Sequence, residues 1–380
     1  MGNIPDGWQL SPIGDVLTLQ RGFDITRATQ RSGDVPVVSS GGVGSYHDTA
    51  AATGPGVVIG RKGTLGKVFF IENDYWPHDT TLWVKDFKGS KPRFVYYFFQ
   101  TLRLEQHDVG SSNPTLNRNH VHPIVVPWPC VHEQKAIAEV LGALDDKIAL
   151  NEQNAAAALE LAGCLYQHES ADHGRWPESA LKDTAKWLSG GTPRTSEPSY
   201  WGGDIPWISA ASLKTPWLFE SERSVTELGA QNGTRLVPKG AILFVVRGMS
   251  LTTEFRVGIA QREVAFGQDC KALIPHASID PVTLFLAIRA QSPKILGMVD
   301  LAGHGTGRLV TERVANLRVR LPHGEAAAGF AARAGALMHR AVAVTNENRT
   351  LADLRDTLLP QLLSGKLRVK DAVRTVEEVV

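Results

Sequence analysis

Two stretches of the chain carry apolar residues at alternating spacings of four and three, which is the pattern of a coiled-coil seam. The first stretch runs from Ile137 to Leu165, and the second runs from Phe330 to Leu362, 193 residues further along. Each stretch predicts a helix of about 33 residues, roughly 50 Å long at 1.5 Å per residue. The seam residues are Ile137, Leu141, Leu144, Ile148 and Asn151 in the first helix, and Leu337, Val344, Asn348, Leu351 and Leu358 in the second.

The two predicted helices share the same phase and a narrow, alanine-rich seam, clearest in NAAAALELAG at 154–163. We therefore expect them to pack against each other as an antiparallel pair; the alternative is an ordinary amphipathic helix in each place. In the seam, Asn151 and Asn348 would fix the register at a cost in stability, whereas at a helix boundary they would face water. Pro360 is expected to end or kink the second helix, because proline lacks the amide donor and clashes with the preceding turn.

Elsewhere the apolar pattern changes to short β-branched runs bounded by glycine, proline, asparagine and aspartate. VPVV, GVVIG and KVFFI occur before the first helix, and AILFVV and RVGIA occur between the two helices. One apolar stretch in each region, 94–102 and 281–291, predicts a core helix. Both regions are therefore expected to be mixed β-rich domains.

The chain also matches itself at fixed shifts. A shift of 168 residues aligns Trp8 with Trp176, and a shift of 193 residues aligns Leu116 with Leu309. Further glycines, prolines and aliphatic residues align in order between these points. An ordered series of matches predicts two homologous modules rather than a chance similarity.

The expected fold is α+β, with two similar mixed β-rich domains joined by two long antiparallel coiled-coil helices. The fold would have approximate two-fold symmetry within one chain, because module and helix alternate twice through short joints. The expected boundaries are 1–130 for the first module, 131–173 for the first helix, 174–323 for the second module, and 324–380 for the second helix and C-terminal tail.

Charge and cysteine content narrow the classes of function. The 380 residues include 40 lysines and arginines against 39 aspartates and glutamates, a formal charge of +1. A global basic field of the histone kind is therefore excluded, and any nucleic-acid binding must come from local patches. Three widely spaced cysteines indicate a reducing compartment, and without a long apolar run we expect a soluble, cytoplasmic protein.

Motifs for the common catalytic chemistries do not occur in the sequence. It has no G-x-x-x-x-G-K-[ST] phosphate loop, no H-E-x-x-H or paired C-x-x-C metal motif, and no G-x-S-x-G nucleophile elbow. We therefore expect a protein that reads another molecule, with no catalytic residue, no metal ligand and no cofactor bound by this chain.

Glycine-punctuated loops in both modules carry many hydrogen-bond donors. Arginine can bind guanine through two hydrogen bonds, asparagine and glutamine can bind adenine, and serine or threonine can bind phosphate. The pattern therefore favours DNA contact, although polar loops are also the ordinary surface of β-rich domains. The candidate residues are Ser39, Ser40, Arg61, Lys62, Thr64, His78, Ser111, Ser112, Asn113, Asn117, Arg118, Thr192, Arg194, Trp207, Ser209, Arg247, Gln268, His304, Thr306 and Arg308.

Three segments indicate what the repeat is. PDGWQLSPIGDVLTLQRG (5–22), GGTPRTSEPSYWGGDIPWISAASL (190–213) and LRDTLLPQLLSGKL (354–367) closely resemble segments of the specificity subunit of type I restriction-modification systems. The resemblance covers nearly the whole chain, in the order target-recognition domain, helix, target-recognition domain, helix. One departure is that the first copy has RGFDITRAT where the second has GGTPRTSEP, which puts a shared approach to DNA in doubt.

The resemblance implies a non-catalytic subunit that selects double-stranded DNA for partner proteins. Each recognition domain would read one half of an asymmetric bipartite target, and the helices would set the unread gap. Two modification subunits would bind S-adenosylmethionine and methylate adenine. ATP-dependent restriction subunits, with Mg²⁺, would cleave unmethylated DNA.

Three other interpretations stay open at this point. The chain could serve a related system in which one partner both methylates and cleaves, or it could be a structural adaptor whose two domains bind proteins. An enzyme is less expected, because two copies of an active site should repeat the same catalytic residues. The aligned positions are mostly tryptophan, glycine, proline and aliphatic residues, although Asp79 and Asp269 recur in similar local settings.

Overall fold

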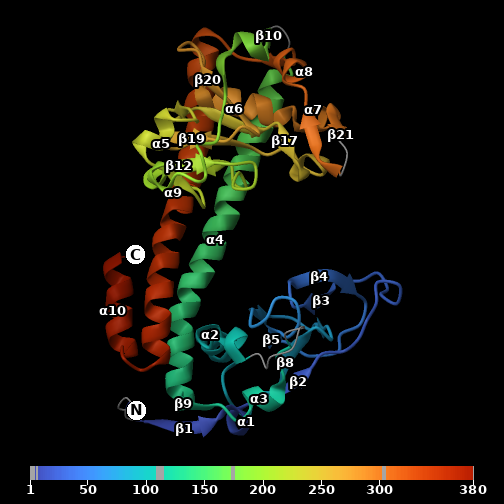
Figure 1. The fold of residues 1–380 in the computed structure, drawn as a ribbon, viewed down its shortest axis with the longest axis vertical. Helices are drawn as coiled ribbons and strands as arrows, with labels where there is room; N and C mark the ends of the chain where they lie inside the picture. The colour runs from blue at the N-terminus through green and yellow to red at the C-terminus, as the bar shows by residue number, and fades with distance from the viewer. Residues whose placement is uncertain (1–4, 6, 108–114, 173–175, 302–304, 380) are drawn as a thin grey trace. The chain divides into compact units, whose positions relative to one another are not determined.

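Two compact units make up the structure, and each contains a β-rich domain with part of a helix pair (Figure 1). Unit 1 consists of Met1–Leu150 and Glu347–Val380, and unit 2 consists of Asn151–Asn346. The long helices α4 (Val131–Ser170) and α9 (Gly324–Leu363) each contribute one half to each unit. The computed structural model describes residues 5, 7–107, 115–172, 176–301 and 305–379.

The main sheet of unit 1 has four antiparallel strands in the order β2-β8-β5-β6. Strand β5 is GVVIG, and all five of its residues are buried because helix α2 and a smaller sheet cover it. The smaller sheet has the order β4-β3-β7, in which β3 and β7 run parallel. The strands are β2 (Thr18–Arg21), β3 (Val35–Ser39), β4 (Gly42–His47), β5 (Gly56–Gly60), β6 (Val68–Ile71), β7 (Trp76–Pro77) and β8 (Thr81–Asp86).

Unit 2 repeats this topology. Its main sheet has the order β11-β20-β16-β18 and adds β13 at one edge, while its second sheet, β14-β12-β19-β15, again contains a parallel pair, β12 and β19. A small sheet β17-β22-β21 is added beside them. The strands are β11 (Ala185–Ser189), β12 (Trp201–Ile208), β13 (Trp217–Leu218), β14 (Ser224–Val225), β15 (Leu236–Val237), β16 (Ile242–Val245), β17 (Arg247–Gly248), β18 (Val257–Ala260), β19 (Val264–Phe266), β20 (Cys270–Pro275), β21 (Val299–Leu301) and β22 (Gly307–Leu309).

A two-stranded antiparallel sheet closes each domain just before its long helix. In the first domain β1 (Trp8–Pro12) pairs with β9 (Val125–Pro129), and in the second β10 (Glu178–Ala180) pairs with β23 (Arg318–Arg320). The start and the end of each domain therefore meet at the beginning of a helix.

Both predicted core helices are confirmed as α2 (Pro92–Thr101) and α6 (Pro281–Ala290). Each begins with proline, whose missing amide donor would be unpaired there in any case. Asp280 caps α6 by accepting a hydrogen bond from the Thr283 amide at 2.7 Å. Other helices are α1 (Ile13–Val16), η1 (Leu104–His107), α3 (Arg118–Val121), η2 (Leu181–Asp183), η3 (Pro198–Tyr200), α5 (Glu227–Gln231), η4 (Met249–Thr252), α7 (Ser292–Leu296), α8 (Thr311–Ala315) and α10 (Val369–Val379).

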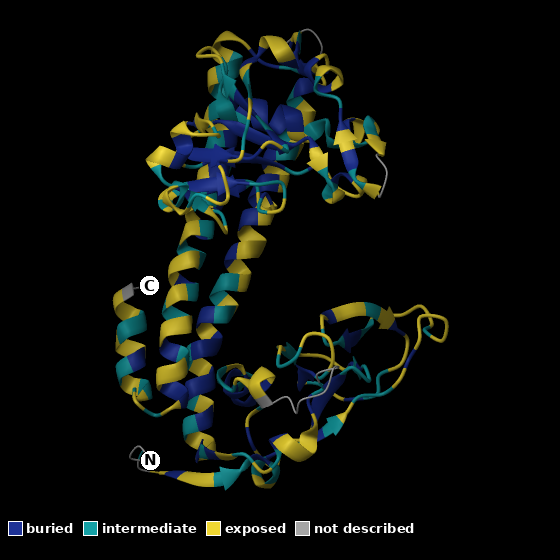
Figure 2. Cartoon of the chain, in the orientation of Figure 1, coloured by how far each residue is buried: buried dark blue, intermediate teal, exposed yellow. Residues whose placement is uncertain are grey.

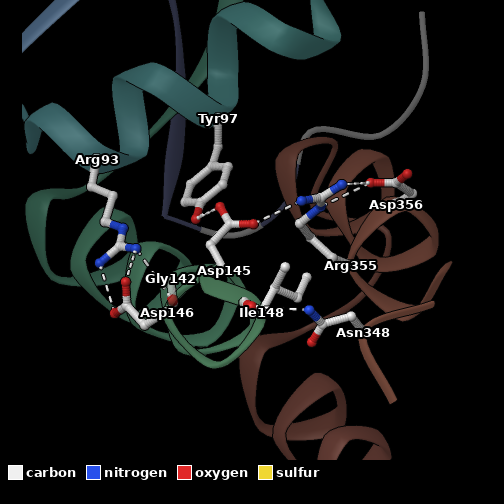
Figure 3. A network of polar contacts seen from close by, with 9 residues as sticks. All are labelled: Arg93, Tyr97, Gly142, Asp145, Asp146, Ile148, Asn348, Arg355 and Asp356. Carbon is white, nitrogen blue, oxygen red and sulfur yellow. Dashed lines mark hydrogen bonds and ion pairs between the residues drawn. The ribbon is translucent and has the colours of Figure 1, made fainter. Parts of the chain in front are cut away.

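The helix pair is antiparallel in unit 1, as predicted. The Asn348 side-chain amide donates to the Ile148 carbonyl at 3.0 Å, and Arg355 Nη1 lies 2.8 Å from Asp145 Oδ1 (Figure 3). Residue numbers rise along one helix as they fall along the other. In unit 2 the same two helices are in contact at Tyr166, whose ring centroid lies 6.2 Å from that of Phe330.

Most of the predicted seam residues are buried, and both helices extend beyond the seam to 40 residues. Asn151 is only 1% exposed, so it lies in the seam and does not face water. Helix α9 includes Pro360 and ends at Leu363, one turn later. Of the other seam residues, Ile148, Leu337 and Asn348 are half-buried, and Ile137, Leu141, Leu144, Val344, Leu351 and Leu358 are buried.

Buried residues concentrate in the sheets of each domain and on the facing sides of the long helices (Figure 2). In each unit the main core joins sheet residues to helix residues without interruption. Each domain is therefore anchored to its helices by a shared core. Among the described residues, no helix combines the length and the apolar character needed to cross a membrane.

Candidate functional site

In the first domain, several loops meet around the backbone of Thr80. The Arg61 and Lys62 amides donate to the Thr80 carbonyl at 2.8 and 3.1 Å, and the Leu116 amide donates to the Arg61 carbonyl at 3.0 Å. The Ser40 amide donates to the Thr80 hydroxyl at 3.2 Å. We call the three backbone hydrogen bonds around Thr80 and Arg61 the loop frame. It brings loops from distant parts of the sequence to one end of the main sheet.

The same loop frame is present in the second domain around Asp269. The Val246 and Arg247 amides donate to the Asp269 carbonyl at 2.8 and 3.3 Å, and the Leu309 amide donates to the Val246 carbonyl at 2.9 Å. The next residue along the chain, after Arg61 in the first domain and after Val246 in the second, also forms an antiparallel bridge. Lys62 is bridged to Thr115, and Arg247 is bridged to Arg308.

These hydrogen bonds fix which residues are equivalent in the two domains. Thr80 corresponds to Asp269, Arg61 to Val246, and Lys62 to Arg247. Asp79 therefore corresponds to Gln268, so the similarity of setting inferred from the sequence for Asp79 and Asp269 was wrong by one residue. The recurrence of aspartate reflects adjacent positions rather than a shared role.

Two glycines that align in the sequence confirm the same correspondence. A Cβ atom on Gly22 would lie 2.2 Å from the His78 carbonyl oxygen, and one on Gly190 would lie 2.3 Å from the Gly267 carbonyl oxygen. Only glycine permits such close backbone approach. The aligned glycines are thus required by packing beside the loop frame.

A hollow lies beside the loop frame in each domain. The first has a volume of about 810 Å³ and the second about 400 Å³. Four lining positions are equivalent, and they carry different side chains: Arg61, Leu82, Asn117 and Arg118 in the first hollow, and Val246, Lys271, Val310 and Thr311 in the second. The two hollows therefore share their backbone arrangement but differ in the charge and polarity of their side chains.

Arginines dominate the first hollow, which Arg21, Arg61 and Arg118 line. Arg21 forms an ion pair with Asp79 at 2.8 Å. Burial and the nearby Arg21 lower the pKa of Arg61 below its ordinary value. One guanidinium nitrogen of Arg61 is buried without a hydrogen-bond partner among the described residues. The hollow therefore offers positive charge to an anionic or acceptor-rich ligand.

Positive charge in the second hollow comes from other positions. Arg247 and Arg308 face each other across the bridge, and Arg247 lies 4.0 Å from Asp269. Lys271, opposite Ser189 on the neighbouring strand, donates to its hydroxyl at 2.6 Å. The ligand that fits one hollow would therefore not be matched by the other.

Sequence reasoning missed Arg21 and Lys271. Both lie at strand ends that face the hollows, Arg21 opposite Leu82 and Lys271 opposite Ser189. The two pairs occupy equivalent positions, but the cation is on the first strand of the pair (β2) in the first domain and on the second strand (β20) in the second domain. Only the strand register reveals this relationship, and the sequence pattern does not give the register.

Several predicted contact residues lie at or near the loop frames. His78 Nδ1 lies 3.0 Å from the Thr80 hydroxyl, and Asn117 caps α3 by accepting from the Asn119 amide at 3.0 Å. Exposed candidates near the frames are Lys62, Thr64, Asn117, Arg118, Arg247, Gln268 and Arg308, and half-buried ones are Ser39, Ser40, Arg61, His78 and Thr306.

Other candidates are placed differently. Trp207 is only 8% exposed, and its indole donates to the Gly191 carbonyl at 3.1 Å, so it supports the fold and offers no ring face for stacking. The Ser209 hydroxyl is engaged with Ser212 at 3.1 Å. Thr192 and Arg194 are exposed on the loop after β11. Four candidates lie outside the described residues: Ser111, Ser112, Asn113 and His304.

One group of side chains in the described part of the chain has the composition of a metal site. Asp24, His78 and Asp79 place ligand atoms within 4.8 Å of one another. Arg21 already neutralises Asp79, and Arg61 adds a second positive charge beside it. These charges disfavour a metal cation, so the group is better described as part of the arginine-rich hollow.

A second pair of equivalent cavities lies where each domain meets a long helix; we call these the helix clefts. The first, about 400 Å³, lies at the start of α2 and against α4, and the second, about 470 Å³, lies at the start of α6 and against α9. Equivalent lining residues are Pro55, Phe70 and Pro92 in the first, and Gly240, Ile259 and Pro281 in the second. Like those of the hollows, these positions are equivalent in the two domains, but here they carry proline, glycine or large apolar residues and no charge.

Comparison with known protein families shows the same duplication. A family model described as the type I restriction modification DNA specificity domain matches residues 5–161 and again residues 174–327. The two matches correspond to the two β-rich domains, each with part of a helix.

Similar curated proteins carry the same description. The type I restriction enzyme EcoR124I/EcoR124II specificity subunit of Escherichia coli is 25% identical over 241 residues, which are 61% of this chain and 59% of that protein. The HindI specificity subunit of Haemophilus influenzae is 23% identical over 196 residues, 50% of this chain and 42% of that protein. The matched part is thus less than two thirds of either relative.

The fold also occurs in a solved structure. The S subunit of a type I restriction-modification system from M. genitalium has a TM-score of 0.61 at 17% identity, and the match covers 95% of this chain and 97% of that chain. The likeness extends over both domains and both helices.

Proposed function

Because the chain belongs to the type I restriction modification DNA specificity domain family, we propose that it selects a specific sequence in double-stranded DNA. The observation that carries the proposal is the duplicated loop frame with different cations in its two hollows. A shared backbone presents each domain to the same kind of polymer, and different side chains suit different bases. The proposed role is recognition without catalysis.

In this proposal each domain reads one half of a bipartite target. In the described part of the chain, the cations that line the first hollow are all guanidinium groups, whereas lysine and arginine are combined around the second. Because the hollows differ at equivalent positions, the two half-sites should differ in sequence and the target should be asymmetric. The helical segments would set the number of unread base pairs between them.

We further propose that partner proteins perform the chemistry. The helix clefts support this, because two equivalent apolar cavities suit two copies of one partner. The partners would be two modification subunits that bind S-adenosylmethionine and methylate adenine, and restriction subunits that use ATP and Mg²⁺. With a net charge of +1, the chain alone neutralises few phosphates, so tight DNA binding should require the partners. The complex would act in the cytoplasm.

The test is to express the chain with its modification partner and sequence the host DNA with a method that detects methylated adenine. An asymmetric bipartite motif supports the proposal. Methylation without a motif, or no sequence-dependent footprint by the purified complex, would favour the structural adaptor. If one partner polypeptide both methylates and cleaves, the related type of system is the correct assignment.

A further inference from the structure

Lys62 and Arg247 are equivalent cations on the two loop frames. Each follows directly the residue whose backbone amide and carbonyl make the frame, and each side chain is exposed. Among the described residues, no hydrogen bond of the Lys62 side chain is present, and Arg247 approaches only Asp269, at 4.0 Å. Both positive charges are therefore available to a ligand at the same point of the fold.

The residues beside these two cations do not match. Lys62 is bridged to Thr115, whereas Arg247 is bridged to Arg308. Thr115 and Arg308 thus occupy the same position and differ in charge. Asp79 and Gln268, which directly precede Thr80 and Asp269, are also equivalent and also differ in charge.

DNA presents the same contrast between constant and variable parts. Its phosphates are identical in every sequence, whereas the base edges in the major groove differ. A cation that occurs at the same backbone position in both domains is suited to bind phosphate. Neighbouring side chains that differ between the domains are suited to contact base edges. Lysine and arginine both bind phosphate, but only arginine holds guanine through a rigid planar fork.

We propose that Lys62 and Arg247 bind the same DNA phosphate position in the two half-sites, while Arg308 in the second domain contacts a base edge. The first domain has Thr115 in that place and would read its bases differently. This inference rests on the proposed DNA recognition. Arg247 and Arg308, which are bridged in one small sheet, would bind phosphate and a base edge respectively.

The bridged arginines allow a matched test with the assembled complex of this chain and its modification partner. Arg247→Lys copies the first domain and keeps the positive charge, so any change in affinity should be the same on every duplex and the sequence preference should not change. Arg308→Lys makes the same chemical change on the neighbouring strand, and should reduce discrimination in one half-site by roughly 5- to 150-fold. Affinities would be measured by fluorescence anisotropy on the target, on duplexes altered in one half-site, and on unrelated DNA.

Removal of each constant cation provides the second arm. Lys62→Ala and Arg247→Ala should weaken binding by a similar factor on all three kinds of duplex, and should each lower the salt dependence by about one unit in slope. Lys85→Ala removes an exposed lysine outside the loop frame and serves as the control. A change of base preference in Arg247→Lys, or none in Arg308→Lys, overturns the inference. If the unsubstituted complex does not distinguish its target from unrelated DNA, the proposed function itself fails.

Discussion

Asp145 on α4 accepts hydrogen bonds on both carboxylate oxygens, one from Arg355 of α9 at 2.8 Å and the other from the Tyr97 phenol of α2 (Figure 3). Burial, together with the hydrogen bond to this carboxylate, raises the pKa of Tyr97 above its ordinary value. One acidic group therefore joins the first recognition domain to both helices of unit 1.

We expect Asp145→Asn to destabilise unit 1 by about 1–3 kcal/mol, because half-buried Arg355 keeps only its exposed partner Asp356 and Tyr97 loses a charged acceptor. The measurement is urea unfolding of the full chain. Glu139→Gln is the matched control, since its pair with Lys135 is exposed and should contribute less than about 0.5 kcal/mol. Equal effects of the two substitutions would show that the network contributes nothing beyond a surface ion pair.

His122 should make the first domain sensitive to mild acid. Its Nε2 atom accepts a hydrogen bond from the Leu19 amide at 3.0 Å, and burial, Arg118 and Lys88 lower its pKa. An unfolded histidine titrates near about 6.5, so below that pH the unfolded state binds more protons than the folded state. The contribution of His122 to the free energy of unfolding is therefore complete above about pH 6.5. It is lost as the pH falls from there toward the lowered pKa of His122 in the folded state.

The measurement is urea unfolding at about pH 7.5 and about pH 5.5. His122→Gln keeps an acceptor for the Leu19 amide and removes the titrating group, so the pH dependence should shrink. A variant with the same loss of stability on acidification as the parent chain would assign the effect to other groups.

Filling one helix cleft should remove one partner copy. Ala143 and Ala343 are exposed alanines that line the first and second cleft, and tryptophan at either position would occupy the cavity. We expect Ala143→Trp or Ala343→Trp to bind one modification subunit, and the double variant to bind none. Light scattering of the purified complex measures the ratio of modification subunits to this chain.

Ala156→Trp, at an exposed position of α4 outside both clefts, is the control and should keep the ratio of the parent chain. Unchanged stoichiometry in both single variants would contradict docking at the clefts.

Shortening the helices should change the gap in the target. Removal of one heptad from residues 137–165, with a matching heptad from α9, shortens each helix by about 10 Å, which corresponds to at most about three base pairs. We expect a shorter gap in the methylated motif, or loss of the complex. Sequencing of methylated adenine distinguishes these results from an unchanged gap, which would exclude the helices as the spacer.

The sequence predicted the helices and the repeat because both depend on periodicity. Ile137 to Leu165 marks a buried stripe whose spacing is set by the helix itself. Placement of the helix end at Pro360 was less accurate, since a proline removes one hydrogen bond and the turn beyond it can still form. Local patterns therefore fixed element types better than their ends.

The contact residues were harder to predict, because their relationship depends on hydrogen bonds between distant loops. The equivalence of Lys62 and Arg247 follows from the amides that reach Thr80 and Asp269, and insertions of different length hide it in the sequence. Trp207 illustrates the opposite error, since this conspicuous aromatic residue, expected in a polar loop, lies in strand β12 and is buried. Composition identifies polar loops, but burial decides which side chains reach a ligand.

The loop frame is made entirely by backbone atoms. Val246 holds the place of Arg61 with the same two hydrogen bonds, one donated and one accepted. Side chains at these positions can therefore be exchanged without dismantling the fold. If each domain reads one half-site, as proposed, such a protein can acquire a new target by a few surface substitutions, and one half can change while the other keeps its old preference.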